Sequence, residues 1–477
     1  MEMFEVSTTF YVVLVIYFAV ILGIGVVSFR KNKNSEDFLV AGRSIGPIVG
    51  GAAFAATQMS AGTFVGTLGV HYLTGASYIW IWLGMWTGWL IAATVVGPKF
   101  QAFKGKTVPD YVGKRYNSRM AHGISALLIV TAYTIYLTAQ YQAGGNVFQT
   151  VFGIPFFWGV LITIGVTLIY TMFGGMRATA YSDFVQAIVM AGCFFAAIPI
   201  LLNQAGGTEF VGSFLQSFSP NMLTWHYGFV DLLGFGAAFG LSICVAPYEL
   251  ARMYTLRSPK TVRLAIGVSM VFQAIVAVSV TIAGMAIRAL YPYMSTPDIA
   301  STIMAINILP PIVGSLIILA IISAVMSTVS GIMIVSASAI SHDFYATMIK
   351  PRATERELMT VNRLAVLVLG VIPVFLALRQ IDLVQFIVIL QASLSASFFF
   401  ATVLFGLNWK RGTAAGAIVS MLGGFTTALS WYIAGSPFGL NEVIPGVIVS
   451  SILYVTVSLF TKPVPQESLR PFFKDIA

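Results

Sequence analysis

Residues 44–70 read SIGPIVGGAAFAATQMSAGTFVGTLGV, an apolar stretch that is long enough to cross a membrane as a helix. About 20 apolar residues span the hydrocarbon core of a bilayer. The stretch is interrupted by Gly46, Pro47, Gly50, Gly51, Gly62, Gly66 and Gly69, and its centre holds the polar residues Thr57, Gln58, Ser60 and Thr63. Irregular backbone at membrane depth is tolerated only where it faces protein or a cavity. The stretch therefore predicts a broken helix inside a helical bundle.

A second apolar stretch, residues 229–250, is interrupted in the same way. Its interrupting residues are Gly234, Gly236, Gly240, Ser242 and Pro247, and it closes on Glu249. The two stretches are five crossings apart, and an odd offset reverses orientation, as between matching helices of two inverted repeats. Paired segments of this kind indicate a transport site. The alternative is that the glycines only permit close helix packing.

Thirteen apolar stretches are predicted to cross the membrane in succession, of which the tenth is short. Their ranges are 7–28, 44–70, 76–98, 120–148, 153–173, 179–204, 229–250, 264–290, 308–341, 364–379, 383–408, 412–434 and 440–461. With the N-terminus outside, every Lys and Arg except Arg288 and Arg379 falls on the cytoplasmic side. Such a bias sets the orientation of membrane proteins. We expect a multi-pass protein of the cell membrane with an external N-terminus and a cytoplasmic C-terminus.

The composition supports this assignment and excludes several classes of function. The chain is 58% hydrophobic and 9% charged, and it has no polar block of domain size, so we expect a single transmembrane domain over residues 1–477. The net charge of +9 lies in short loops, where it attracts anionic lipid rather than nucleic acid. Gly105-Lys106-Thr107 lacks the upstream glycine of a phosphate-binding loop. We expect no enzyme activity, but transport driven by an ion gradient.

The ninth crossing holds the most concentrated group of polar residues. Ser323, Ser327 and Ser330 share one face of a helix, and Thr328 lies beside them. Hydroxyls and freed backbone carbonyls are suitable ligands for a small hard cation. The alternative is that each hydroxyl bonds to a carbonyl one turn earlier in its own helix.

Asp183 begins the sixth crossing, and a carboxylate within a membrane segment is a candidate functional residue. The alternative is that Asp183 caps the N-terminus of a helix, where an acidic group is favourable. Asp231, at the start of the seventh crossing, has the same alternative.

Several motifs resemble those of a known family over nearly the whole chain. They are FLVAGRSIGP at 38–47, ATQMS from residue 56, Gly174-Gly175 followed by SDFVQ at 182–186, and AVMST at 324–328 followed by HDFY at 342–345. Together they resemble the sodium:solute symporter family, which includes proline, pantothenate, sugar, sialate and monocarboxylate carriers. The resemblance implies an all-α fold whose core has five plus five helices in inverted repeats, of the leucine-transporter type. We place the two repeats at residues 44–204 and 229–408.

The resemblance also implies two sites. Na+, the coupling ion, would bind the carbonyls of Ala56, Met59 and Ala324 and the hydroxyls of Ser327 and Thr328, with Asp183 as an electrostatic support. We expect the helices to break near residues 56–60 and 242–247, with the freed backbone groups facing a common cavity. The residues expected to line the solute are Gln58, Phe239, Ile243 and Pro247, with Tyr136, Gln140 and Gln391 as further candidates.

Two departures from the family pattern bear on the solute. Proline carriers place Asp where Gln58 stands, and Trp and Tyr at the positions of Phe239 and Ile243. The segments SAGTF at 60–64 and ILPP at 308–311 are closer to pantothenate and monocarboxylate carriers. We therefore expect sodium-coupled import of a small carboxylate, although no Lys or Arg is placed deep enough to pair with it.

Three other functions remain open at this point. They are a proline-like amino acid symporter, a passive channel or facilitator of the same fold, and a proton-coupled carrier. The proton-coupled carrier is disfavoured because the expected ligand set holds no protonatable carboxylate.

Overall fold

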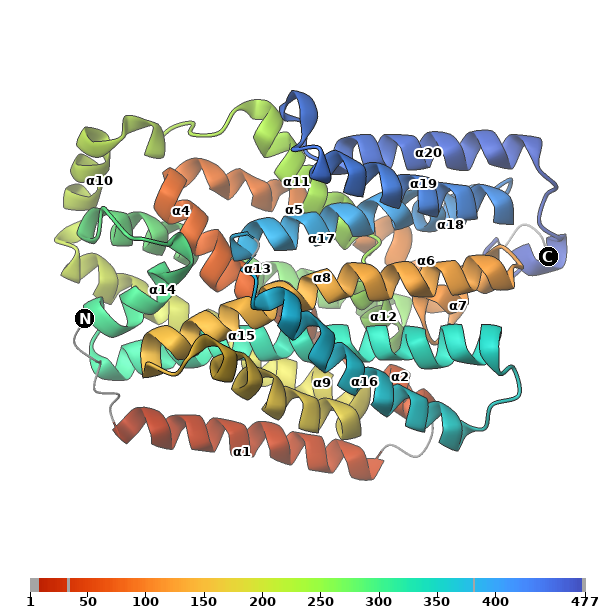
Figure 1. Ribbon diagram of the computed structural model, residues 1–477, viewed down its shortest axis with the longest axis horizontal. Helices are drawn as coiled ribbons and strands as arrows, with labels where there is room; N and C mark the ends of the chain where they lie inside the picture. Colours follow the sequence, from red (N-terminus) through yellow and green to blue (C-terminus); the bar gives the residue numbers. More distant parts are fainter. Residues whose placement is uncertain (1–7, 32–34, 381, 474–477) are drawn as a thin grey trace.

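The computed structural model describes residues 8–31, 35–380 and 382–473 (Figure 1). Within these ranges the chain is helical, and its only strand-like pairing is an isolated bridge between Ile45 and Leu256. Eleven of the described helices are long and apolar enough to cross a membrane. The prediction of an all-α membrane protein is confirmed, whereas the number of thirteen crossings stays a prediction.

The first half of the chain runs from α1 to α10. The α-helices are α1 (Thr8–Lys31), α2 (Ser35–Val40), α3 (Pro47–Gln58), α4 (Leu68–Thr74), α5 (Ile81–Ile91), α6 (Gly97–Phe103), α7 (Val108–Arg115), α8 (Arg119–Phe152), α9 (Phe156–Gln204) and α10 (Gly207–Phe218). Four short 3-10 or π elements connect them, namely η1 (Ala41–Arg43), η2 (Gly62–Thr67), η3 (Gly75–Trp80) and η4 (Ala92–Val96).

The second half begins after η5 (Pro220–Met222). Its α-helices are α11 (Phe229–Ile243), α12 (Pro247–Thr255), α13 (Pro259–Leu290), α14 (Ala300–Ile303), α15 (Pro311–Ser338), α16 (Glu355–Ala377), α17 (Val384–Phe399), α18 (Gly406–Asn408), α19 (Ala414–Ile433), α20 (Val443–Phe460) and α21 (Gln466–Leu469). The 3-10 and π elements are η6 (Pro297–Ile299), η7 (Met304–Ile308), η8 (Ala339–Ile349), η9 (Phe400–Phe405) and η10 (Pro437–Gly439).

The bundle has central and peripheral helices. In Figure 1, α1 lies along the lower edge and α19 and α20 along the upper edge. In the most apolar 18 residues of each span, 83% of the residues are buried in Pro311–Ile349 and 89% in Val384–Asn408, but only 22% in Phe10–Lys31. The helices α15 and α17 therefore form the centre, and α1 presents most of its surface to lipid.

The two ends of the bundle differ in charge. Helix α1 begins at the left of Figure 1 and ends toward the right with Arg30 and Lys31, and α20 also ends at the right. Helices α6 and α7, with Lys114 and Arg115 in the last turn of α7, lie at this same side. We call it the basic end. Because α1 begins at one end and α20 stops at the other, the chain path fits an odd number of crossings.

One predicted boundary agrees with the structure and another differs clearly. The fifth and sixth crossings are the two parts of α9, which a kink separates at Gly175, where a left-handed φ of 60° favours glycine. Helix α16 begins at Glu355, well before the predicted start at 364. Thr354 caps it, since its hydroxyl accepts from the Glu357 N–H at 3.3 Å and Glu357 accepts from the Thr354 N–H at 3.0 Å. The polar first turns of α16 hid this start from a search for apolar residues.

Both predicted helix breaks are present. Helix α3 ends at Gln58, and Met59 has left the helical conformation with a ψ of 64°. Helix α11 ends at Ile243 and α12 begins at Pro247, which removes a backbone donor at that point.

Several glycines of these two segments also serve close helix packing, in addition to the helix breaks. A Cβ added to Gly51 would lie 2.4 Å from the Ala265 carbonyl oxygen of α13, and one added to Gly66 would lie 2.8 Å from the Gln385 nitrogen of α17. A Cβ on Gly240 would lie 2.4 Å from the Gly84 carbonyl oxygen of α5. These glycines therefore bring neighbouring backbones together, and the helix breaks lie at other positions.

Candidate functional site

The broken helix α3 meets the central helix α15 through polar groups. The Ser327 hydroxyl donates to the Ala56 carbonyl at 2.9 Å, and the Thr328 hydroxyl donates to the Thr57 carbonyl at 3.2 Å. All four residues are fully buried. The last four carbonyls of a helix lack partners within the helix, and they carry the negative end of its dipole. The hydroxyls of α15 therefore satisfy the C-terminal end of α3.

The hydroxyl face of α15 divides into two groups. Ser323 donates to the Leu319 carbonyl at 2.8 Å and Ser330 to the Ser327 carbonyl at 3.0 Å, so these two follow the alternative of bonding within their own helix. Ser327 also contacts the Ala324 carbonyl at 3.0 Å. The carbonyls of Ala56 and Ala324 thus converge on one hydroxyl.

This convergence suits a small hard cation. The oxygens of Ala56, Ala324, Ser327 and Thr328 are neutral and lie at the negative end of α3, and Met59 follows directly where that helix ends. A cation that entered here would take the place of the hydroxyl protons as the partner of the carbonyls. The predicted ligand residues are therefore brought together by the fold.

Part of the predicted solute site is also assembled. The Tyr248 hydroxyl donates to the Gln58 side-chain oxygen at 2.9 Å, and the ring centroid of Tyr248 lies 6.2 Å from that of Tyr136. The Tyr248 N–H, in the first turn of α12 after Pro247, donates to the Tyr133 hydroxyl at 2.9 Å. Gln58 is 8% exposed, so the site is nearly closed. Sequence reasoning missed Tyr248 and Tyr133, which carry no motif of their own.

The remaining predicted solute residues are placed differently. The Gln140 oxygen accepts from the Ala61 N–H at 3.2 Å, so Gln140 lies against the break that follows α3. Its side-chain nitrogen has no hydrogen-bond partner within the described part of the chain. Gln391 donates to Ser395 of its own helix at 2.7 Å. Phe239 and Ile243 lie buried in the last turns of α11, beside the second break.

Asp183 is not a helix cap, because it lies inside α9. Its Oδ2 atom lies 2.7 Å from Nη1 of Arg252, and both side chains are buried. A Cβ on Gly331 of α15 would lie 2.6 Å from Nη2 of Arg252, so the guanidinium passes directly over this glycine. Arg252, which the sequence analysis counted on the cytoplasmic side, is therefore buried within the bundle and paired with Asp183. Asp231, in contrast, caps α11 by accepting from the Gly228 N–H at 3.2 Å, as its alternative stated.

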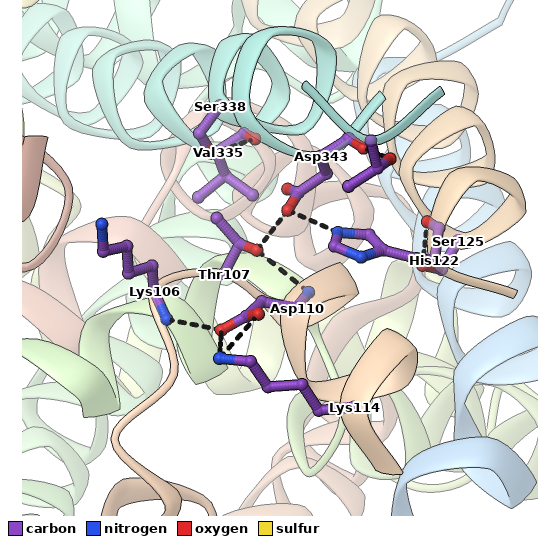
Figure 2. Close-up of polar contacts among 10 residues, drawn as sticks. Lys106, Thr107, Asp110, Lys114, His122, Ser125, Val335, Ser338 and Asp343 are labelled. Carbon is purple, nitrogen blue, oxygen red and sulfur yellow. Dashed lines mark hydrogen bonds and ion pairs between the residues drawn. The ribbon is translucent and has the colours of Figure 1, made fainter. Parts of the chain in front are cut away.

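A further polar cluster lies at the basic end (Figure 2). Oδ1 of Asp343, in η8, accepts from the Thr107 hydroxyl at 2.6 Å and lies 2.8 Å from Nε2 of His122 in α8. Thr107 also caps α7 by accepting from the Asp110 N–H at 3.1 Å. Because Asp343 is fully buried, these contacts hold α7, α8 and η8 together beside the site.

The comparisons with known sequences agree over almost the whole chain. The model of the sodium:solute symporter family matches residues 38–424. The osmoregulated proline transporter OpuE of Bacillus subtilis is 28% identical over 473 residues, 96% of each chain. The sodium/proline symporter 2 of Staphylococcus saprophyticus is 30% identical over 480 residues, 95% of this chain and 93% of the relative.

Solved structures share the fold at low sequence identity. A sodium-coupled sialic acid symporter in a substrate-bound outward-open state has a TM-score of 0.82 at 18% identity, over 97% of this chain and all of that one. Mhp1, a nucleobase-cation-symport-1 family transporter, has a TM-score of 0.62 at 13% identity in a closed conformation, over 94% of this chain and 99% of that one. These neighbours are transporters of the leucine-transporter fold. Since the family model also covers most of the sequence, the chain belongs to the sodium:solute symporter family, in which sodium is the coupling ion.

Proposed function

We propose that this protein is a sodium-coupled symporter that imports proline or a closely related small zwitterionic amino acid. The observation that carries the proposal is the full-length similarity to two proline transporters, at 28% and 30% identity. The relatives thus favour the amino acid alternative over the small carboxylate that we expected from the sequence.

The chemistry of the candidate site supports a zwitterion. The polar side chains around the breaks are the amides of Gln58 and Gln140 and the hydroxyls of Tyr136 and Tyr248, and the nearby Arg252 is already paired with Asp183. A carboxylate group of the solute would face the N-terminal end of α12, and an ammonium group the C-terminal carbonyls of α3. A zwitterion matches both helix ends and adds no net charge.

The solute need not be proline alone. Gln58 stands where proline carriers of the family have Asp, and its amide oxygen is held by the Tyr248 hydroxyl at 2.9 Å. An amide offers a weaker partner than a carboxylate for an ammonium group. We propose that Gln58, Phe239, Ile243 and Pro247 contact the solute, with Tyr136, Gln140 and Gln391 as further candidates, and that the range of accepted solutes is broader than in those carriers.

We propose that one Na+ binds the carbonyls of Ala56, Met59 and Ala324 and the hydroxyls of Ser327 and Thr328. The contacts of 2.9 to 3.2 Å between α3 and α15 support this site, with Asp183 acting at a distance through its charge. Moving one charge through 100 mV is worth about 2.3 kcal/mol, nearly two decades of accumulation at about 1.36 kcal/mol each. A zwitterion carried with one Na+ gains this energy, whereas a monoanion would gain none.

Reconstitution in liposomes tests the function. Purified protein with an imposed inward Na+ gradient should concentrate labelled proline above equilibrium, and unlabelled proline should compete better than lactate or pantothenate. The same gradient made with K+ serves as the control. Uptake that never exceeds equilibrium would favour a passive facilitator, and stronger competition by a monocarboxylate would restore the carboxylate hypothesis.

We propose that the protein resides in the cell membrane with the basic end in the cytoplasm and the N-terminus outside. The Lys and Arg bias supports this orientation. A cysteine introduced at Asn221, which is exposed between α10 and α11, should react with an impermeant thiol reagent from outside intact cells. One at Thr354, exposed before α16, should react only after permeabilisation. The reverse pattern would invert the orientation.

We also propose that residues 44–204 and 229–408 form two inverted repeats of one transmembrane domain. The support is that α3 and α11 break at corresponding places, and that Ile45, before α3, pairs with Leu256, after α12. An experimental structure in which the two ranges superpose only in the same orientation would contradict the repeat.

A further inference from the structure

One buried carboxylate in the described part of the chain differs from the others. Four of the buried Asp and Glu side chains have polar partners: Asp183 with Arg252, Asp343 with His122 and Thr107, Asp298 with the Val384 N–H at 3.1 Å, and Glu442 with Ser393 and Asn441. Glu249 is 0% exposed, and neither of its carboxylate oxygens has a hydrogen-bond partner among the residues that the structure describes. Buried polar groups nearly always have partners, so this exception requires an explanation.

Glu249 lies in the first turns of α12, two residues after Pro247. The titratable groups that act on it electrostatically are Arg252 of the same helix and Asp183 of α9, and it acts in turn on Tyr133 and Tyr136 of α8. Tyr248, its neighbour in α12, is the remaining titratable group of this set. Helices α3 and α15, which also pack against α12, contain no titratable residue.

The basic residues of the other elements that pack against α12 have partners at the basic end. They are Arg43 of η1 with Glu36 of α2 at 3.2 Å, Lys99 of α6 with Asn408 at 2.6 Å, and Lys114 of α7 with Asp110 at 3.0 Å. Arg115 donates to the Gly406 carbonyl at 2.6 Å. Arg252 is therefore the cation that serves this buried group.

The charges do not balance if every group is ionised. Arg252 supplies one positive charge, and its guanidinium is in contact with Asp183 at 2.7 Å. Glu249 would then be a second negative charge that is fully buried and has no hydrogen-bond donor among the described residues. An ionised carboxylate in such a place is strongly disfavoured and takes up a proton instead. A Na+ ion would need several oxygen ligands, whereas a proton needs only one carboxylate oxygen.

A small void lies beside α12 at the basic end. Ala251, two residues after Glu249, lines a void of about 10 Å³ together with Met176, Thr107, Val335 and Ser338. Thr107 and Ser338 also lie beside Asp343 in Figure 2. A void must offer about 10 to 15 Å³ to hold one water molecule. The void is at this limit, and its lining does not include Glu249, which is fully buried. Water can therefore reach Glu249 only if the helices around it move.

We propose that Glu249 is a proton-binding site of the transport cycle, which holds a proton while the site is closed and releases it toward the basic end when α12 moves away from α8. The proposal rests on the proposed sodium-coupled transport, to which it adds a proton-linked step. One O–H bond of the carboxylic acid breaks, and water at the basic end accepts the proton. Protonated Glu249 is neutral, so the charges of Arg252 and Asp183 balance each other and no further cation is required.

Infrared spectroscopy of the purified protein tests the site without relying on transport. The wild type at neutral pH should show the carbonyl stretch of a protonated carboxyl group that Glu249→Gln lacks. The matched control is Glu467→Gln, which removes an exposed carboxylate of α21 and should leave this band in place. If Glu249→Gln does not fold, Glu249→Asp should shift the band in frequency. A wild-type spectrum identical to that of the variant in this region overturns the proposal.

Transport at varied internal pH provides the second readout. In proteoliposomes with a fixed Na+ gradient, the wild-type uptake rate should change with internal pH by up to about tenfold per pH unit, the limit for one proton. Glu249→Gln should flatten this profile, and Glu249→Asp should restore it with a shifted midpoint. Sodium-driven uptake with coinciding profiles for the wild type and Glu249→Gln refutes the proton step but leaves the proposed function intact. If the wild type shows no sodium-driven uptake at any pH, the proposed function is refuted, and the infrared test still decides the proton site.

Discussion

The contact between α3 and α15 and the contact between α9 and α12 are both buried and polar, but they are built from different groups. The first joins neutral hydroxyls and carbonyls, Ser327 to Ala56 and Thr328 to Thr57. The second joins full charges, Asp183 to Arg252 at 2.7 Å. Neutral oxygens can exchange one partner for another at modest cost, whereas a buried charge must stay neutralised. The first contact is suited to a reversible ion site, and the second to a permanent link.

The largest effect is expected from removing the charge of Arg252. Arg252→Ala leaves Asp183 buried without a partner, and breaking a buried ion pair destabilises by roughly 3–5 kcal/mol. We expect a strong loss of folded protein, measured as a fall in melting temperature of the purified protein in detergent.

Two further variants sharpen this test of the charged contact. Arg263→Ala, at an exposed position early in α13, should melt like the wild type. Asp183→Asn should recover part of the stability lost in Arg252→Ala, because it removes the unpaired carboxylate. Equal melting temperatures for Arg252→Ala and the wild type would show that the two contacts do not differ as described.

The neutral contact should affect sodium binding more than folding. In the double variant Ser327→Ala with Thr328→Ala, the Na+ concentration for half-maximal uptake should rise at least about tenfold, the equivalent of 1.4 kcal/mol or the order of one or two lost ligand contacts. The amount of folded protein should change little. Ser315→Ala is the matched control, since this hydroxyl donates to the Pro311 carbonyl within α15. An unchanged sodium dependence in the double variant would remove the ion site from this contact.

Substitutions in the predicted solute site near the first helix break should change solute binding without a matching change in Na+ binding. Gln58→Ala and Phe239→Ala should change the competition profile among amino acids, and Gln58→Ala should alter solute affinity far more than sodium affinity. Gln391→Ala should have a smaller effect, because its side chain bonds to Ser395 in its own helix. Competition experiments with proline analogues measure this. The same profile in the wild type, Gln58→Ala and Phe239→Ala would place the pocket elsewhere.

The smallest effect is expected at an exposed ion pair. Lys350 and Glu357 lie 2.6 Å apart in water, and the hydrogen bond from Lys350 lowers the pKa of Glu357. A lowered pKa contributes stability above the unfolded pKa, which is lost as the pH falls through the folded pKa. Solvent screens this pair, so Lys350→Ala should leave the melting temperature almost unchanged at neutral pH. If Lys350→Ala lowered the melting temperature as much as Arg252→Ala, burial would not determine how much an ion pair contributes to stability.

The membrane class, the family and the positions of both helix breaks could be predicted from the sequence. They depend on patterns that extend over many residues or on a short motif, such as Pro247 or the run from Ala56 to Ser60. The predicted sodium ligands are brought together for the same reason, because α3 and α15 each present several of them in one segment.

The polar contacts between distant helices could not be predicted in this way. Arg252 was expected in a basic cluster at the membrane surface, yet it turns inward to Asp183, 69 positions earlier in the numbering of the chain. Tyr248 reaches Gln58 across two elements that share no sequence pattern. Such pairs depend on how helices cross, which the order of residues in one segment does not report. The packing partner of each glycine could not be predicted for the same reason, because it lies on another helix.

The contact of α5 with α11 limits which substitutions this protein can accept over evolutionary time. A Cβ at Gly84 would lie 2.2 Å from the Gly236 oxygen, and one at Gly88 would lie 2.2 Å from the Gly240 oxygen. Gly240 is equally confined, whereas a Cβ at Gly236 would meet the Gly84 Cα at an ordinary 3.7 Å. Alanine should therefore be accepted at Gly236 but not at Gly84, Gly88 or Gly240. At these glycines no side chain separates the backbones of α5 and α11, and we expect the two helices to move together through the transport cycle.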